Sequence, residues 1–287
     1  MDTILKTISD HALLRVSEAK KKIPPEELKS RALHMNCDTG FPFERALADG
    51  DISFICECKK ASPSKGIIAE EFPYLDIAIS YETAGAACIS VLTEPKWFLG
   101  QDRYLKEITD TVSIPCIRKD FTVDEYMIYE AKVLGASAVL LICAILDTET
   151  LRRYIKICDS LGLSALVEAH DESEIRSAID AGARIIGVNN RNLKDFTVDV
   201  RNSQRLRALV PKEILFVAES GIRTSEDIQI LRDAGVNGVL IGETLMRAPD
   251  KKAMLDQLRG VSPAPETASE APAGAEDRSK KGDACNV

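Results

Sequence analysis

The chain has 287 residues, 45% hydrophobic and 29% charged, which is ordinary for a globular protein of one large α/β domain or two small ones. Its formal net charge of -8 argues against electrostatic binding to nucleic acids or membrane surfaces. No apolar run reaches the roughly 18 residues that span a bilayer, and the N-terminus lacks the features of a secretory signal.

Eight cysteines and only three histidines are present. Five of the cysteines fall inside apolar, strand-like runs: Cys56, Cys58, Cys88, Cys116 and Cys143. No Cys-x2-Cys pair or His cluster stands near them. We therefore expect reduced core thiols in a cytosolic, cytoplasmic protein, and neither a disulfide framework nor a metal site.

Residues 1–46 predict an N-terminal helical extension. Five apolar residues recur there at helical spacing: Ile4, Leu5, Ile8, Ala12 and Val16. Pro24 and Pro25 end that helix, and residues 26–33 predict a second, shorter one.

From residue 52 onward, strand-like and helical segments alternate. The predicted strands are residues 53–59, 87–93, 115–119, 138–144, 165–169, 185–189, 215–219 and 238–242. Helical patterns cover about 70–84, 99–110, 124–134, 148–161, 172–181, 200–209, 225–234 and 250–258. This alternation predicts a parallel sheet, and eight units fit an α/β fold of the (β/α)8 TIM barrel type over residues 47–260. The alternative is an open doubly wound sheet, but no Gly-x-Gly-x-x-Gly follows the first strand.

Residues 261–287 have a different composition from the rest of the chain. They are rich in Ala, Pro, Glu, Ser and Gly, with almost no large apolar residue and no periodicity. This composition predicts a disordered tail.

The stretch ISFICECKKASPSKG, residues 52–66, joins a strand-like run to a loop rich in Lys, Ser and Pro. Side chains alternate along a strand, so Glu57 and Lys59 share one face, roughly 7 Å apart, while Cys56 and Cys58 share the other. A Glu–Lys pair in an otherwise apolar sheet is costly unless it has a use. We predict a functional pair; the alternative is a surface ion pair at a strand end.

Polar residues also end the later strands, at the edge where active sites of this fold gather. They are Lys119, Glu168, Asn189, Arg191 and Glu219. A lysine with a partly apolar collar can have a lowered pKa and act as a general acid, which is the role we predict for Lys119. The alternative is a lysine that leaves the barrel for solvent.

The ends of the last strands also suit a phosphate group. Ser220-Gly221 and Gly242-Glu243 offer backbone N–H groups with little steric hindrance, and Arg191 can add a charged fork. Loops after the seventh and eighth strands are the usual phosphate site of this fold.

Taken in order, these motifs resemble the indole-3-glycerol-phosphate synthase family over about residues 1–258. The matching strings are Glu57-x-Lys59, Ser-Pro-Ser at 62–64, Val91-Leu-Thr-Glu94, Arg118-Lys-Asp-Phe121, Val167-Glu-Ala-His170, Gly187-Val-Asn-Asn-Arg191, Ala218-Glu-Ser-Gly221 and Leu240-Ile-Gly242. Two positions depart from the family: Glu243 replaces a frequent Ser, and Trp97-Phe98 replaces another aromatic pair.

The resemblance implies ring closure of 1-(2-carboxyphenylamino)-1-deoxyribulose 5-phosphate to indole-3-glycerol phosphate, with loss of carbon dioxide and water and without cofactor or metal. Lys119 would protonate the C2′ carbonyl oxygen, and Glu168 and Lys59 would form the acid–base pair of the dehydration. The spacing leaves open which of these three performs each proton transfer. Glu57 would keep Lys59 charged.

The other implied roles concern binding. Two residues would orient the lysines and bind sugar hydroxyls: Asn189 and Glu219. Five would hold the phosphate: Arg191, Ser220, Gly221, Gly242 and Glu243. Three would line the pocket for the anthranilate ring: Ser62, Phe98 and Phe121.

Two other functions fit the same fold. A Schiff-base aldolase would use Lys119 as a nucleophile, and borohydride trapping would label it covalently. A phosphate-sugar binding protein would need the phosphate loops but not the charged residues at three strand ends. We expect the synthase, as a monomer that can contact other enzymes of the tryptophan pathway.

Overall fold

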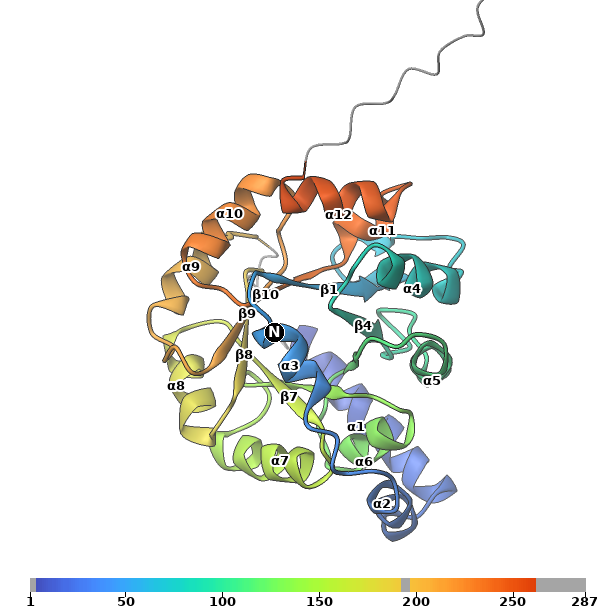
Figure 1. Ribbon diagram of the computed structural model, residues 1–287. Helices are drawn as coiled ribbons and strands as arrows, with labels where there is room; N and C mark the ends of the chain where they lie inside the picture. The colour runs from blue at the N-terminus through green and yellow to red at the C-terminus, as the bar shows by residue number, and fades with distance from the viewer. Residues whose placement is uncertain (1–3, 192–196, 262–287) are drawn as a thin grey trace, which may run out of the picture.

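In the computed structural model, which describes residues 4–191 and 197–261, parallel strands close into a barrel (Figure 1). Around the barrel the strands are β1 (Ser53–Cys58), β10 (Gly238–Ile241), β9 (Leu215–Glu219), β8 (Ile185–Asn189), β7 (Ser164–Ala169), β6 (Ala138–Ile142), β5 (Cys116–Lys119) and β4 (Cys88–Leu92). The predicted (β/α)8 barrel is confirmed.

Helices follow the strands and cover the outside of the barrel. They are α4 (Tyr74–Thr83), α5 (Asp102–Thr111), α6 (Tyr126–Val133), α7 (Thr148–Ser160), α8 (Glu172–Ala181), α9 (Arg201–Arg207), α10 (Ser225–Asp233), α11 (Glu243–Arg247) and α12 (Lys251–Arg259). Before the barrel come α1 (Ile4–Lys22), α2 (Pro25–Leu33) and α3 (Pro42–Ala48). A small hairpin, β2 (Ala61–Ser62) and β3 (Gly66–Ile67), lies in the loop after β1. The sequence did not predict α3, α11 or this hairpin.

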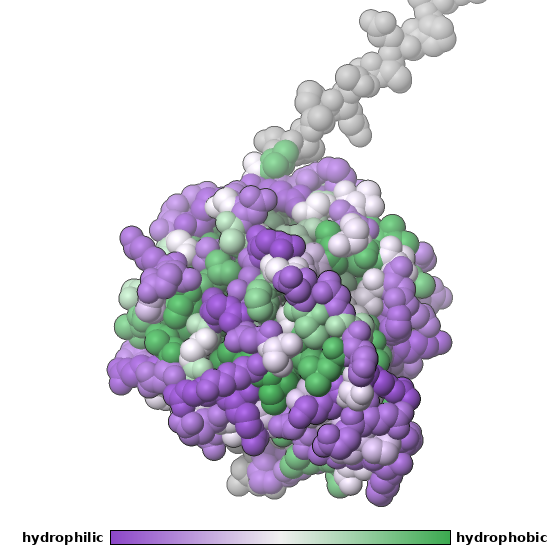
Figure 2. All heavy atoms as spheres, turned by 60° about the horizontal axis from the view of Figure 1, so that its bottom comes forward, coloured by the Kyte–Doolittle hydropathy of each residue, from purple (hydrophilic) through white to green (hydrophobic). Residues whose placement is uncertain are grey.

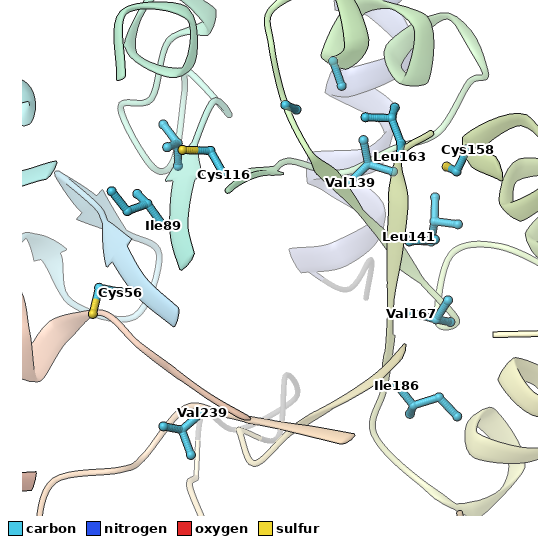
Figure 3. Close-up of a cluster of buried hydrophobic side chains, with 14 of the residues drawn as sticks. Cys56, Ile89, Cys116, Val139, Leu141, Cys158, Leu163, Val167, Ile186 and Val239 are labelled. Atoms are coloured by element: carbon cyan, nitrogen blue, oxygen red, sulfur yellow. The ribbon is translucent and has the colours of Figure 1, made fainter. Parts of the chain in front are cut away.

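Two apolar layers follow from the alternation of side chains along the strands. Residues such as Cys56, Val139 and Val167 point outward and pack under the helices, as Figure 3 shows. Their strand neighbours, among them Ile55 and Leu166, belong to a separate cluster inside the barrel. The barrel is therefore a packed core, and only its ends remain for function.

The two ends of the barrel are covered by different helices. Phe43 and Leu47 of α3 belong to the interior cluster, and Leu47 lies beside Gly238 at the start of β10. Ile8 of α1 enters the same cluster and also lines a cavity at the opposite end. In Figure 1, α3 lies in front of the strands and the fainter α1 behind them.

Polar side chains cover most of the face seen in Figure 2, with apolar ones visible between them. In the described part of the chain, no helix combines the length and apolar character needed to cross a membrane. The described cysteines are free thiols, and those in β1, β4 and β5 are buried. Cys143 lies in a turn after β6 and not in a strand, contrary to expectation. The predicted tail falls almost entirely outside the described residues.

Candidate active site

Charged side chains from three strands meet inside the barrel at the C-terminal ends of the strands. Nζ of Lys119, the last residue of β5, lies 3.3 Å from Oε2 of Glu168 on β7 and 3.2 Å from Oε2 of Glu219 on β9. Asn189, at the end of β8, donates a 3.4 Å hydrogen bond to Oε1 of Glu168. Both carboxylates are buried, and the Lys119 side chain is 13% exposed. Their charges are sustained by one another, because isolated buried ions would be very costly.

The pair predicted on β1 lies in the same cavity. Nζ of Lys59 forms an ion pair with Oε2 of Glu57, and Oγ of Ser90 lies 3.5 Å from Oε1 of Glu57. Cys56 and Cys58 belong to the outer apolar layer, on the opposite face of the strand. The alternative of a surface ion pair is wrong, because the Glu57 side chain is buried.

Electrostatics in this cluster differ from the expectation for Lys119. Burial alone would lower the pKa of Lys119, but Glu219, Glu168 and Glu57 raise it above its usual value. The expected lowered pKa is therefore wrong, because carboxylates rather than apolar groups surround the ammonium.

The two carboxylates beside Lys119 are shifted in opposite directions. Burial raises the pKa of Glu219 to about 7; Lys119 opposes this shift, while the negative charge of Glu168 adds to it. Burial also favours neutral Glu168, but Lys119 and His170 hold its pKa below the usual range. Two neighbouring carboxylates with separated pKa values suit distinct acid–base roles.

Two glycines leave space for the carboxylates of Glu219 and Glu57. A Cβ added at Gly187 of β8 would overlap Oε1 of Glu219, and one at Gly242 would overlap Oε2 of Glu57. Neither glycine has a positive φ, so close approach of the carboxylates is the reason for glycine at both positions.

The loop after β9 has an unusual backbone. Ser220 and Gly221 both have left-handed conformations, with φ of 67° and 84°. Ser220 is one of few described non-glycine residues with positive φ, and Asn190 supports it with a 3.2 Å hydrogen bond to its carbonyl. Successive turn amides of this kind suit anion binding.

At the neighbouring strand end, Glu243 opens α11. Its carboxylate lies 3.7 Å from Nζ of Lys65 and 3.2 Å from Nε of Arg247. Two cations therefore offset the charge of the Glu243 carboxylate.

An aromatic wall forms another side of the cavity. The rings of Phe98 and Phe121 lie 6.2 Å apart at 43°. The loop that carries Phe98 is fixed by buried Glu94, which accepts backbone hydrogen bonds from Lys96, Trp97 and Phe98. Trp97 instead packs edge-on against the His11 ring, 5.2 Å away.

One cavity of about 370 Å³ brings together every residue that the sequence predicted for the site. These are Glu57, Lys59, Ser62, Phe98, Lys119, Phe121, Glu168, Asn189, Arg191, Glu219, Ser220, Gly221, Gly242 and Glu243. The sequence assigned no site role to the remaining lining residues, which include Arg223, Arg247, Ser64 and Ile68. Arg247 could have been suspected, because it lies one helical turn after Glu243. Nothing in the local pattern points to Arg223.

This fold and cavity define a (β/α)8-barrel enzyme with acid–base groups at the C-terminal ends of its strands. The sequence profile of the indole-3-glycerol phosphate synthase family matches residues 5–258. The chain belongs to this family of decarboxylating, ring-closing lyases of tryptophan biosynthesis.

Relatives that carry the family name cover almost the whole chain. The one from Ruminiclostridium cellulolyticum is 61% identical over 257 residues, which are 90% of this chain and 99% of the relative. The one from Lachnoclostridium phytofermentans is 50% identical over 272 residues, covering 91% and 99%.

Solved structures with low sequence identity share the fold alone. Thiamine phosphate pyrophosphorylase from Pyrococcus furiosus has a TM-score of 0.55 at 16% identity, covering 73% of this chain and 94% of that one. A chain of the tryptophan synthase complex from Pyrococcus furiosus also has a TM-score of 0.55, at 15% identity, covering 73% and 98%.

Proposed function

We propose that the cavity binds 1-(2-carboxyphenylamino)-1-deoxyribulose 5-phosphate and closes its indole ring. The observation that carries this proposal is the ammonium group of Lys119 between buried Glu168 and Glu219, in the same cavity as a second Lys–Glu pair. Ring closure followed by dehydration needs a proton donor and a proton acceptor within reach of one substrate. Membership of the synthase family supports the same reaction.

In the first step, the ring carbon that carries the carboxylate attacks C2′ of the ribulose chain. The carbonyl electrons move to oxygen, which takes a proton from Lys119. The neighbouring carboxylates favour this role, since they keep Lys119 protonated at neutral pH. Carbon dioxide then leaves, and its bonding electrons restore the aromatic ring.

In the second step, the new hydroxyl leaves as water. Lys59 supplies a proton to the departing oxygen, and Glu168 removes a proton from C1′, so that the second ring becomes aromatic. Glu168 suits the role of base because its depressed pKa keeps it ionised. Glu57 supports Lys59 through their ion pair.

The remaining polar residues bind and orient the substrate. Glu219 positions Lys119, Asn189 positions Glu168, and both can bind sugar hydroxyls. The phosphate group binds at the mouth residues that follow β8, β9 and β10: Arg191, Ser220, Gly221, Gly242 and Glu243. The anthranilate ring packs in the pocket formed by Ser62, Phe98 and Phe121.

The test is an indole-fluorescence assay with the anthranilate–ribulose phosphate and no added metal. We expect Lys119→Ala and Glu168→Gln each to lower turnover about 100-fold or more, the usual scale of general acid–base catalysis, while the fold is retained. Lys106→Ala is the matched control, because Lys106 lies on the surface of α5 in an ion pair with Asp110. Turnover close to that of the unaltered chain in either site variant contradicts the assignment.

A borohydride control separates the synthase from an aldolase on the same fold. A Schiff-base mechanism requires a neutral lysine amine, whereas the pKa of Lys119 is raised by its carboxylates. We therefore expect no covalent labelling when borohydride is added with the substrate. Labelling at Lys119 would favour the aldolase.

The proposal extends to a monomer in the cytoplasm that can contact other enzymes of the tryptophan pathway. Free thiols at every described cysteine support a reducing compartment. Sedimentation of the purified chain tests the monomer, and a concentration-dependent larger species contradicts it.

A further inference from the structure

His170 lies just beyond β7 and contacts two carboxylates. Its Nε2 is 3.3 Å from Oε1 of Glu168, and its Nδ1 is 2.9 Å from Oε2 of Glu174 on α8. The imidazole therefore joins the proposed base, Glu168, to an acidic residue that does not line the substrate cavity.

Local hydrogen bonds fix this arrangement. Oε2 of Glu174 also accepts a 2.7 Å bond from the backbone N–H of His170. Asp171 caps α8 by accepting from the backbone of Ser173 and Glu174. Asn202 of α9 donates to the His170 carbonyl. These bonds fix the backbone that carries the ring, and Glu174 contacts the ring as well.

The charges around the ring favour the imidazolium form. Burial alone would lower the pKa of His170, but Glu168 and Glu174 raise it to about 10. Asp171, in the same loop, adds negative charge on this side. Lys119 is the cation on the far side of Glu168.

His170 faces a second hollow, of about 930 Å³, next to the substrate cavity. Glu174 and Asp171 line this hollow with it, and α1 contributes the charged residues Lys6 and Asp10. Other polar residues that line it include Asn189, Asn190, Arg191, Asp199 and Asn202. Glu168 lines only the substrate cavity, so His170 reaches the base from behind.

We propose that His170 is a positioning residue that, clamped by Glu174, holds Glu168 ionised and correctly placed from the side opposite the substrate. This inference rests on the proposed function, because it assigns to Glu168 the role of base. His170 itself touches no substrate. Removing it takes a positive charge from the carboxylate and frees the side chain to move.

The expected effect of removing His170 is a change in the pH dependence of kcat, and not an equal loss of kcat at every pH. Without the imidazolium, the pKa of Glu168 rises, so that the base is protonated at a higher pH. His170→Gln should move the acid limb of the kcat profile upward by about one pH unit, on the scale of a lost charged neighbour. kcat should fall several-fold on the acid limb itself, at pH values below the ordinary pKa of a carboxyl group, and approach the unaltered value at neutral pH, with KM little changed.

Two further variants sharpen the test. Glu174→Gln keeps the imidazole but removes one carboxylate, and we expect a smaller shift in the same direction. His34→Gln is the matched control, because His34 is exposed at the end of α2 and its ring contacts Ser30 of that helix. Its kcat profile should not move. An unshifted acid limb in His170→Gln, or a loss that is equal at every pH, overturns the inference.

A second readout does not depend on turnover. With only three histidines, imidazole nitrogen resonances can be assigned by single substitutions. We expect the His170 ring to stay protonated above pH 8, and to titrate at lower pH in both Glu174→Gln and Glu168→Gln. An imidazole that titrates near its ordinary value in the unaltered chain overturns the inference. If Glu168→Gln retains turnover but the ring titration is as expected, the role of Glu168 as base fails while the pairing stands.

Discussion

The two ends of the barrel are built from the same strands but have opposite chemistry. At the N-terminal end, α3 inserts Phe43 and Leu47, which are fully buried among apolar side chains. At the C-terminal end, Glu168 and Glu219 are almost equally buried and the Lys119 side chain is 13% exposed, yet all three are ionisable. Burial of apolar side chains at the N-terminal end stabilises the fold. Burial at the C-terminal end instead brings ionisable groups close together, which is costly unless they are paired.

Ion pairs show the same contrast. We call the N-terminal end, which α3 covers, the closed end, and the C-terminal end, which holds the cavity, the open end. At the closed end, Arg184 pairs with Glu44 and Asp159 at 2.8 Å, but its side chain is 41% exposed. Such pairs contribute little to stability, because water screens them. At the C-terminal end, the carboxylates beside Lys119 are buried, and neighbouring charges shift the pKa values of Lys119 and Glu219. Stability and chemistry are therefore separable along the barrel axis, and variants at the two ends should have different effects.

The largest expected effect is on stability at the closed end. Phe43→Ala removes a fully buried ring and should lower the free energy of unfolding by about 3–5 kcal/mol. kcat, measured well below the melting temperature, should stay close to the unaltered value. Phe98→Ala, in the aromatic wall, is the counterpart and should raise KM with a smaller loss of stability. Urea unfolding and saturation kinetics of both variants test the contrast, and a similar profile for the two would refute it.

A pair of glycines provides the next test. Gly187→Ala places a methyl group against the Glu219 carboxylate and should lower kcat/KM roughly 100-fold, because displaced catalytic groups lose alignment. Gly238→Ala places the same methyl group 2.9 Å from Leu47 at the closed end. It should cost about 1–3 kcal/mol of stability through overpacking, with activity retained. If Gly238→Ala lowers kcat/KM as much as Gly187→Ala does, the two ends are not separable.

The sequence predicted what short-range patterns determine. Apolar runs located every barrel strand, with ends correct to within two residues. The helices α3 and α11 were missed, and α11 has only five residues, too few to establish a helical period. The acid–base groups were located as polar residues that end predicted strands, since a parallel barrel brings the C-terminal ends of all its strands to one face.

Long-range electrostatics could not be predicted in the same way. The lysine at the end of β5 appeared to have an apolar collar, but Glu168, its partner, is 49 positions away in the sequence. The wrong direction for the pKa of Lys119 follows from that separation. By contrast, His170 and Glu174 are four positions apart, and their pairing was accessible from helix-start geometry.

The contact between α1 and the open end is another long-range feature. Arg15 of α1 donates bonds of 3.0 and 2.7 Å to the carboxylate of Asp120, which lies between Lys119 and Phe121. Asp120 also accepts from Thr93 and is buried. This ion pair therefore joins the helix that covers the cavity to the strand end that carries the proposed acid.

The last contrast follows from cutting that connection. Arg15→Met leaves Asp120 with less compensation, which should lower stability by about 2–3 kcal/mol, below the 3–5 kcal/mol of fully buried pairs because Arg15 is 21% exposed. KM should rise more than kcat falls, since α1 lines the cavity while Lys119 keeps its own partners. Lys21→Met is the control on the same helix, where an exposed pair with Glu18 contributes at most about 1 kcal/mol. Urea unfolding and substrate saturation curves distinguish the two, and equal effects would show that α1 covers the open end without stabilising it.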